Sequence, residues 1–208
     1  MKAQKKEKIN IAVLVSGGGT NLQALIDSTV IKSGVIRLVI SSNASAYALK
    51  RAKNAKIKSE IVDKLNYPTL EKREEKMLEL LKANDIDLIV LAGFLSILSK
   101  HFIKHYENRI INVHPSLIPA FCGKGYYGLI VHKRVLEKGV KITGATTHFV
   151  NEIADDGEII MQKAVRVYKN DTEEKLQLRV MKQAEHIILP KSVELVSKQI
   201  LGERDVKA

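Results

Sequence analysis

The chain has 208 residues, of which 45% are hydrophobic and 27% are charged, and its net charge is +11. This length favours one sizeable core over two full domains, and the composition is that of an ordinary globular protein. The single cysteine, Cys122, excludes a disulfide framework, and no segment approaches the roughly 18 apolar residues that a membrane-spanning helix needs. These features predict a cytoplasmic protein without a membrane partner.

The positive net charge makes nucleic-acid binding an alternative to an enzymatic function. However, the basic residues are spread along the whole chain and mixed with acidic ones, as in residues 70–76, where opposite charges at helical spacing indicate a solvated helix face. The aromatic residues do not alternate with basic ones to form a stacking platform. We therefore expect no nucleic-acid partner, and a basic surface that attracts small polyanionic substrates.

Apolar runs alternate with amphipathic segments along the chain, a pattern typical of βαβ units around a parallel sheet. Strands are predicted at Ile9–Val15, Val35–Ser41, Ser59–Val62, Leu88–Ala92, Ile110–His114, Ile142–Val150 and Glu158–Val167. Helices are predicted at Asn21–Ser28, Ala46–Ala55, Leu70–Ala83, Ser99–His105 and Leu129–Lys138. The predicted fold is α/β, a doubly wound and mostly parallel sheet flanked by helices, with functional sites at the carboxyl ends of its strands.

The two ends of the chain need separate interpretation. The first predicted strand follows several lysines and so imitates a signal peptide, but it is too short and glycines follow it at once. Near the other end, Asp171 and Glu174 have the spacing of a capping box, which predicts a helix capped by Asp171. Pro190 lies within the helical pattern that follows and predicts that the final helix bends or ends there.

A glycine-rich loop, Ser16–Asn21 (SGGGTN), connects the first predicted strand to the first predicted helix. Glycine lets the backbone approach a ligand closely, and free amide groups there can bind an anion. A dinucleotide site is not predicted, because Leu22 replaces the third glycine of that fingerprint and residues 41–43 lack its acidic residue. The lysine of a nucleoside-triphosphate loop is also missing, so the pattern predicts a site for one phosphate. The alternative is a tight turn capped by Thr20 or Asn21.

Asn112 and His114 stand at the end of a predicted buried strand, immediately before Pro115. Because side chains alternate along a strand, both point to the same face, where the strand opens into a loop. A neutral amide donor and a titratable imidazole together can stabilise a developing oxyanion. The alternative is a polar strand end whose side chains only fix the next loop.

Two further loops carry polar groups. Asn151–Gly157 holds several carboxylates, which can fix a protonated imidazole, and the alternatives are simple turn formation or a weak metal loop. Pro115–Gly128 contains Cys122, either a nucleophile or a small hydrophobic residue. His101 and His105 have metal-ligand spacing but lack a third ligand, so no metal is predicted.

These segments, in this order, resemble the folate-dependent formyltransferases, and the resemblance covers nearly the whole chain, from about Ile9 to Ile200. It rests on five motifs, which are Ser16–Gln23 (SGGGTNLQ), Leu91–Phe94 (LAGF), Asn112–Pro119 (NVHPSLIP), Gly144–Val150 (GATTHFV) and Gln183–His186 (QAEH). The resemblance implies formyl transfer from 10-formyltetrahydrofolate, as a co-substrate, to the amine of glycinamide ribonucleotide in purine biosynthesis, in a Rossmann-like fold and without a metal.

The resemblance also implies roles for individual residues. The catalytic residues would be Asn112, His114 and Asp155. The substrate phosphate and ribose would be bound by Gly18, Gly19, Thr20, Asn21 and Glu185. The reduced folate would lie beside Leu95, Ser96, Ile97, Leu98, Asn112, Asn151 and Asp155. Thr146 would support the catalytic aspartate, with His148 close by.

We also expect a single domain over residues 1–208, acting as a monomer or a homodimer. In it, residues 1–8 would form a disordered basic tail, residues 9–112 a phosphate-binding half, and residues 113–208 a folate-binding and catalytic half. Three positions depart from the family pattern. Asp156 places a second carboxylate beside the catalytic one, Ser96 replaces an arginine of some relatives, and residues 121–128 replace a loop that contains Pro-Gly. The first departure leaves open which aspartate acts, and the other two bear on folate affinity.

Formyltetrahydrofolate hydrolase, in which water replaces the amine, is the alternative function within the family. Those hydrolases carry an additional N-terminal regulatory domain, and the related methionyl-tRNA formyltransferases carry a C-terminal nucleic-acid-binding domain. We expect neither domain here, because few residues precede Ile9 or follow the last predicted helix. The glycine-rich loop favours the ribonucleotide substrate, since only that substrate needs a phosphate site there.

Overall fold

Seven strands form one sheet in the order β3-β2-β1-β4-β5-β6-β7 within residues 8–207, the part of the chain that the computed structural model describes. The strands are β1 (Ile9–Val15), β2 (Gly34–Ser41), β3 (Lys58–Ile61), β4 (Leu88–Leu91), β5 (Ile110–His114), β6 (Ile142–Phe149) and β7 (Ile159–Arg166). The strands β1 to β5 pair in parallel, whereas β6 and β7 pair antiparallel. The predicted doubly wound, mostly parallel sheet is therefore confirmed.

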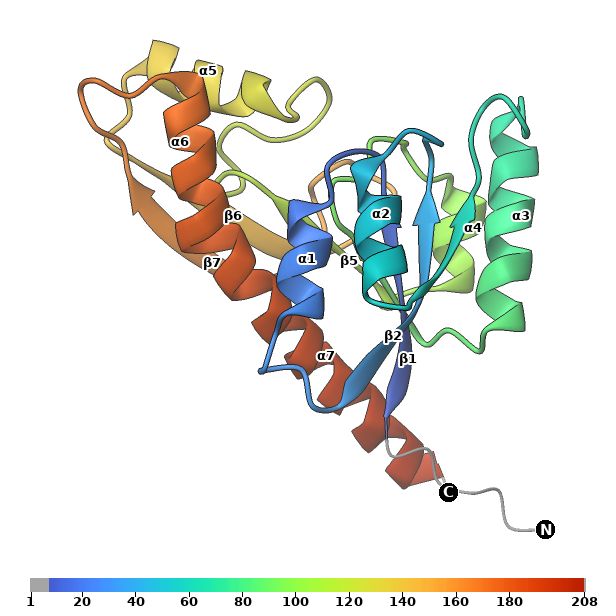
Figure 1. Ribbon diagram of the computed structural model, residues 1–208. Coiled ribbons are helices and arrows are strands. Elements are labelled where there is room, and N and C mark those ends of the chain that lie inside the picture. The colour runs from blue at the N-terminus through green and yellow to red at the C-terminus, as the bar shows by residue number, and fades with distance from the viewer. Residues whose placement is uncertain (1–7, 208) are drawn as a thin grey trace, which may run out of the picture.

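Helices connect the parallel strands and continue after β7 (Figure 1). They are α1 (Thr20–Ile26), α2 (Tyr47–Asn54), α3 (Leu70–Ala83), α4 (Lys100–His105), α5 (Leu129–Lys138), α6 (Glu173–Val180), the π-helical turn η1 (Met181–Glu185) and α7 (His186–Lys207). In Figure 1, α6 and α7 follow one another as a long column that ends at the C-terminus. The predicted basic tail, apart from Lys8, lies outside the described residues.

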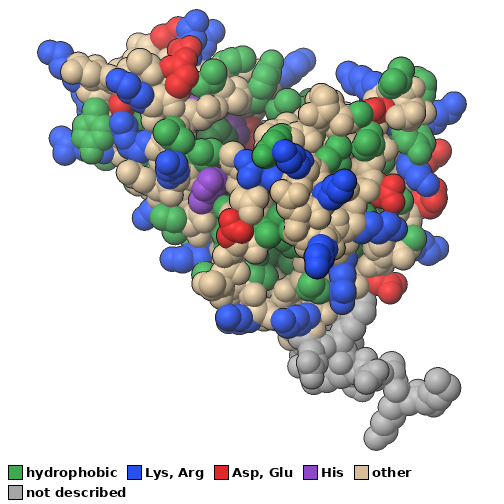
Figure 2. Space-filling view, in the orientation of Figure 1, with side chains coloured by type: hydrophobic (Ala, Val, Ile, Leu, Met, Phe, Trp, Pro, Cys, Tyr) green, Lys and Arg blue, Asp and Glu red, His purple; other side chains and the backbone are tan. Residues whose placement is uncertain are grey.

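The strand β1 explains why helices cover both faces of the sheet. Ile11 and Val13 belong to a core that includes α1, α2 and α7, whereas Ala12 and Leu14 belong to a second core that includes α3 and α4. A continuous apolar run is what a strand buried on both faces requires. No helix in residues 8–207 is both long enough and apolar enough to cross a bilayer. On the face that Figure 2 shows, basic side chains are scattered, with acidic ones among them.

The predicted cap of the penultimate helix is wrong. Thr172 is the N-cap of α6, and its hydroxyl accepts the N–H of Lys175 at 3.3 Å. Asp171 instead forms two hydrogen bonds with the guanidinium of Arg179, each 2.5 Å long. A bidentate ion pair is a stronger interaction for a carboxylate than a single backbone cap, and it depends on a residue two turns away.

The final helix was predicted to bend or end near Pro190, and the second alternative is wrong, because α7 continues to Lys207. The irregularity lies earlier, in η1, where the backbone makes a π-helical turn. The missing N–H of Pro190 would face the carbonyl of His186, the first residue of α7. The proline therefore falls where the α-helical ladder is only beginning, and α7 accommodates it.

The order of the strands reverses beside β1, because β2 and β3 lie on one side of it and β4 and β5 lie on the other. In such sheets, ligands bind in the crevice at the carboxyl ends of the strands next to this reversal. The loops after β1 and β4 meet there, and the hydroxyl of Ser16 accepts the N–H of Leu95 at 2.9 Å. This edge of the sheet carries the residues that the sequence singled out.

Candidate active site

Asn112 and His114 lie at the carboxyl end of β5, and His114 is buried. The antiparallel pairing of β5 with β6 places His148 opposite Asn112 and Thr146 opposite His114. Side chains of directly opposed residues share one face of a sheet. The register of two neighbouring strands therefore brings four polar side chains together.

Asp155 joins this group from the loop after β6. Its Oδ2 lies 3.4 Å from Nδ1 of His114, and its Oδ1 lies 3.4 Å from Nδ2 of Asn112 and 3.6 Å from Nε2 of His148. The neighbouring Asp156 is exposed, whereas the side chain of Asp155 is only 14% exposed. The geometry thus favours Asp155 over Asp156 as the carboxylate of the site.

Two backbone groups that no sequence pattern marks complete the surroundings of this carboxylate and imidazole. The carbonyl of Phe121 accepts a hydrogen bond from Nε2 of His114 at 2.9 Å, and the N–H of Gly123 donates to Oδ2 of Asp155 at 2.9 Å. Because a carbonyl only accepts, Nε2 carries a proton and Nδ1 faces the carboxylate. The loop that follows β5 therefore holds both groups in place.

His148 orients the amide of Asn112. Its Nδ1 lies 2.8 Å from the carbonyl of Phe149, which can only accept, so this nitrogen carries the proton. The other nitrogen, Nε2, is then an acceptor for Nδ2 of Asn112 at 3.1 Å. The nitrogen and the oxygen of the Asn112 side-chain amide are assigned here from their hydrogen-bond partners. His148 thus lies beside Asn112 and Asp155, close to the predicted catalytic residues.

Burial and charge act in opposite directions on the two central groups. Burial lowers the pKa of His114, and the carboxylate of Asp155 and the carbonyl of Phe121 only partly offset this. Burial alone would raise the pKa of Asp155, but the charge of His114 and the N–H of Gly123 hold that pKa below its ordinary value. Asp155 is therefore ionised at neutral pH, and His114 depends on this carboxylate to hold a second proton.

Among the described residues, the partners of the Thr146 hydroxyl are groups other than the carboxylate of Asp155. This hydroxyl donates to the carbonyl of Ser116 at 2.7 Å and accepts the N–H of Ile118 at 3.1 Å and Nε2 of Gln162 at 3.0 Å. Because Thr146 lies opposite His114 in the sheet, it faces the start of the loop that follows β5. It fixes that loop and acts on the site only indirectly.

A cavity of about 130 Å³ borders these polar side chains. The predicted folate contacts that line it are Ser96, Ile97, Leu98, Asn112, Asn151 and Asp155. Leu95 does not line this cavity, and its side chain is 66% exposed. Ile97 and Ile153 are 72% and 64% exposed at the cavity, although both are apolar. Exposed apolar side chains beside a few convergent polar groups are typical of a small-molecule site.

The glycine-rich loop lies against the predicted ribose contact. Nδ2 of Asn21 donates to Oε2 of Glu185 at 2.7 Å, which joins the start of α1 to η1. Burial raises the pKa of Glu185, and Oδ1 of Asn21 is buried without a hydrogen-bond partner among the described residues. The structure therefore brings together two residues that are 164 positions apart in the sequence and were both predicted to bind the substrate.

The other candidates from the sequence are not arranged for chemistry. Burial, followed by the charges of Asp155 and Asp156, raises the pKa of the Cys122 thiol, which disfavours a reactive thiolate. Nδ1 of His105 lies 2.9 Å from the carbonyl of His101 on α4. Among the described residues, no group of three or more His, Cys, Asp and Glu side chains is placed to hold a metal ion.

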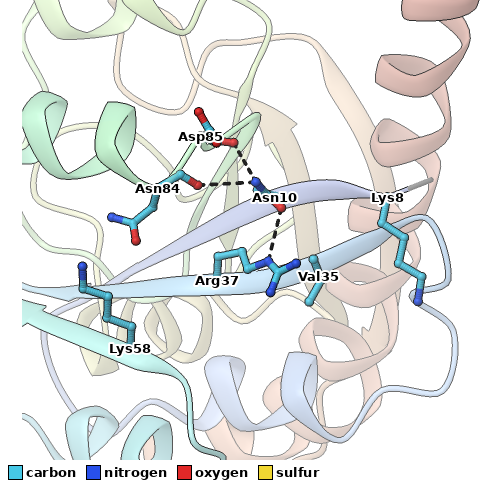
Figure 3. Close-up of a pocket in the computed structure, with 7 residues that line it drawn as sticks. All are labelled: Lys8, Asn10, Val35, Arg37, Lys58, Asn84 and Asp85. Atoms are coloured by element: carbon cyan, nitrogen blue, oxygen red, sulfur yellow. Dashed lines mark hydrogen bonds between the residues drawn. The ribbon is translucent and has the colours of Figure 1, made fainter. Parts of the chain in front are cut away.

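A larger cavity, of about 790 Å³, lies near the amino ends of β1 and β2 (Figure 3). Nε of Arg37 donates there to Oδ1 of Asn10 at 3.3 Å, and the amide of Asn10 donates to the carbonyls of Asn84 and Asp85. None of the predicted site residues lines this cavity. Its size alone therefore does not make it the active site.

His132 gives a stability prediction. It is fully buried in α5, and both its ring nitrogens lack partners among the described residues. Burial, with a smaller contribution from His114, lowers the pKa of His132 to about 4, below the unfolded value of 6.5. Its contribution to stability is therefore complete above pH 6.5 and is lost as the pH falls toward 4.

We expect this histidine to lower the free energy of unfolding by up to about 1.4 kcal/mol for each pH unit in that window. His132→Leu should remove this slope, because leucine leaves no buried polar group to protonate. Urea denaturation of both proteins at pH 7 and pH 5 measures the difference. An unchanged slope in the variant would contradict the assignment.

Comparisons with known proteins agree with the geometry. A family model described as formyl transferase matches residues 9–193. Phosphoribosylglycinamide formyltransferase of Escherichia coli is 38% identical over 184 residues, which are 88% of this chain and 84% of that protein. The trifunctional purine biosynthetic protein adenosine-3 of Gallus gallus is 43% identical over 192 residues, which are 91% of this chain but only 18% of that longer protein.

Solved structures lead to the same group of proteins. Glycinamide ribonucleotide transformylase 1 from Symbiobacterium toebii superimposes with a TM-score of 0.86 at 39% identity, covering 96% of this chain and 92% of that one. Phosphoribosylglycinamide formyltransferase from Anaplasma phagocytophilum superimposes with a TM-score of 0.83, also at 39% identity, covering 92% and 88% of the two chains. The resemblance inferred from the sequence motifs is therefore confirmed at the level of the family.

Proposed function

This chain belongs to the formyl transferase family, and we propose that it transfers the formyl group of 10-formyltetrahydrofolate to the amine of glycinamide ribonucleotide in purine biosynthesis. The bacterial relatives named above, of which this chain covers more than four fifths, carry this activity in their names. The observation that carries the proposal is the convergence of Asn112, His114 and Asp155, of which Asn112 and Asp155 line the cavity. A cytoplasmic location and a monomer or homodimer remain predictions.

In the proposed reaction, the amine of the ribonucleotide attacks the formyl carbon on N10 of the folate. A new carbon–nitrogen bond forms, and the formyl oxygen becomes an oxyanion. The amide of Asn112 would donate to that oxyanion, and the positive charge of the protonated His114 ring would stabilise it electrostatically. When the bond to N10 breaks, the proton lost by the amine is transferred to N10, with Asp155 as the ionised group that helps to move it.

The two substrates would lie on either side of these residues. The reduced folate would occupy the cavity lined by Ile97, Leu98 and Asn151, where apolar side chains surround the polar group. The phosphate of the ribonucleotide would lie at the loop that contains Gly18 and Gly19, with the ribose near Glu185. The hydrogen bond between Asn21 and Glu185 supports this placement, because it holds the phosphate and ribose contacts together.

The first test follows the release of tetrahydrofolate from 10-formyltetrahydrofolate with and without glycinamide ribonucleotide. Release that depends on the ribonucleotide is expected of the transferase. Release at an equal rate without any amine acceptor would overturn the proposal and indicate a hydrolase. Product analysis of the formylated ribonucleotide distinguishes transfer from stimulated hydrolysis.

Asn112→Ala is expected to lower kcat by about 10²–10³-fold, the usual effect of losing one oxyanion donor. The residue is only partly buried, and its amide bonds mainly to His148, so the fold should persist. Steady-state kinetics with both substrates saturating measures the change. A variant with nearly wild-type kcat would remove Asn112 from the oxyanion site.

A further inference from the structure

The second helix, α2, holds two consecutive carbonyls of the glycine-rich loop. The N–H of Ala48 donates to the carbonyl of Gly17 at 3.1 Å, and Nε of Arg51 donates to the carbonyl of Gly18 at 2.8 Å. Contact is close, because a Cβ built on Gly19 would lie 2.6 Å from Cβ of Ala48. The conformation of the loop is thus set by α2, although α2 contains none of the residues that were predicted to bind the substrate.

These two bonds determine where the amide groups of the loop point. In a trans peptide, the N–H points opposite to the carbonyl of the preceding residue. With the carbonyls of Gly17 and Gly18 directed toward α2, the N–H groups of Gly18 and Gly19 are directed away from it. No group in the described part of the chain accepts a hydrogen bond from either N–H. A Cβ on Gly17 or Gly18 would meet nothing within 4 Å, so there is open space beside both residues.

Arg51 is itself held in place by its neighbours. Its Nη1 donates to Oε1 of Gln23 at 3.1 Å, and Nε2 of Gln23 in turn donates to Asp27 at 2.8 Å. The guanidinium also lies over the ring of Tyr47, 4.9 Å from its centroid. A planar, permanently charged group that is fixed at three sides is suited to orient a backbone carbonyl.

We propose that Arg51 is a positioning residue for the phosphate of the substrate, which it serves by holding the carbonyl of Gly18 away from the binding side of the loop. The inference rests on the proposed function, because it assumes that the phosphate binds this loop. The fixed positive charge of Arg51 beside the loop also favours binding, because it attracts the phosphate dianion of the substrate. Arg51 then contributes to substrate affinity and not to the transfer step, which takes place at the end of β5.

The test compares steady-state constants of the wild type, Arg51→Ala, Arg51→Lys and a control, Lys50→Ala. We expect Arg51→Ala to raise KM for glycinamide ribonucleotide about tenfold or more, as the loss of a charge-assisted hydrogen bond predicts. The kcat and the KM for 10-formyltetrahydrofolate should stay within about twofold. Arg51→Lys keeps the charge but not the planar fork, so its KM should lie between the other two.

Lys50→Ala is a matched control, because it removes a positive charge from the same helix and a cation 5.5 Å from the same tyrosine ring, yet within the described part of the chain Lys50 has no hydrogen bond to the loop. Its constants should resemble those of the wild type. A KM in Arg51→Ala within about twofold of wild type would overturn the inference, as would an equal rise in Lys50→Ala or in the KM for the folate.

Inorganic phosphate provides a second measurement that does not depend on turnover. Titration of the isotopically labelled free protein should shift the amide resonances of Gly18 and Gly19, with an affinity about tenfold lower in Arg51→Ala. Phosphate binding at these amides in a wild type that lacks transferase activity would refute the proposed function but keep this inference. Transferase activity with equal phosphate binding in both proteins would refute this inference alone.

Discussion

His114→Ala is expected to lower kcat for formyl transfer by about 10³–10⁴-fold, more than Asn112→Ala does. Alanine removes the positive charge that would stabilise the oxyanion beside Asp155, and it removes the hydrogen bond to the carbonyl of Phe121. Single-turnover and steady-state measurements of tetrahydrofolate release, with both substrates saturating, test this. The KM values should change much less than kcat, because the ring acts mainly in the transition state.

Because His114 is buried, its loss could also affect folding, so two further proteins are needed. His114→Gln retains a polar donor with less loss of volume, and it should be nearly as inactive while its melting temperature stays close to that of wild type. His105→Ala removes an exposed histidine from α4 and should have normal kinetics. Turnover of His114→Ala within about tenfold of wild type would exclude the proposed role.

Asp155→Asn is expected to lower kcat by about 10²–10⁴-fold, as the loss of a group that assists proton transfer predicts. Asparagine is the appropriate replacement, because residue 155 has a φ of 57° and asparagine tolerates the left-handed region far better than alanine does. The substitution removes the negative charge that helps His114 to hold a proton. The lost activity therefore has an electrostatic cause that can be measured separately.

The loss of this negative charge predicts the direction in which the pH dependence of the activity changes. Burial lowers the pKa of His114, and Asp155 opposes this, so the pKa should fall further in Asp155→Asn. If the reaction needs the protonated ring, activity declines as the pH rises through this pKa, and the residual activity of the variant should be confined to lower pH. NMR titration of the imidazole measures the pKa directly. A higher pKa in the variant would contradict the assignment.

Asp156→Asn is the matched control, because it removes the same charge from the adjacent position of the same loop. Asp156 is exposed, whereas the Asp155 side chain is only 14% exposed and lies near both histidines. The control should keep kcat within about twofold of wild type. If Asp156→Asn were the inactive variant, the carboxylate of the site would have to be reassigned.

The sequence alone predicted the order of strands and helices, because buried strands appear as continuous apolar runs and helices repeat their apolar residues at helical spacing. It also singled out Asn112 and His114, since alternation along one strand requires them to share a face. The glycine-rich loop was predicted for the same local reason. The family followed from motifs in the order in which they occur, and the comparisons confirm it.

Contacts between distant segments were decided only by the tertiary structure. The antiparallel register that sets His148 opposite Asn112 joins residues 36 positions apart, and no periodicity within one strand fixes such a register. The same holds for Thr146, whose hydroxyl supports a loop and not the aspartate, and for Asp171, which pairs with Arg179 and does not cap a helix.

For the residues proposed to surround the two substrates, some features were also predicted from the sequence and others were decided only by the tertiary structure. Composition and motif spacing predicted a phosphate loop, but the hold of Arg51 on the carbonyl of Gly18 links residues 33 positions apart and became visible only when α2 packed against the loop. The choice between Asp155 and Asp156 also needed the fold, because adjacent carboxylates are equivalent in sequence and differ only in which of them is buried beside His114. Local pattern determined which chemical groups this protein carries at its strand ends, and packing between remote elements decided how those groups are oriented and charged.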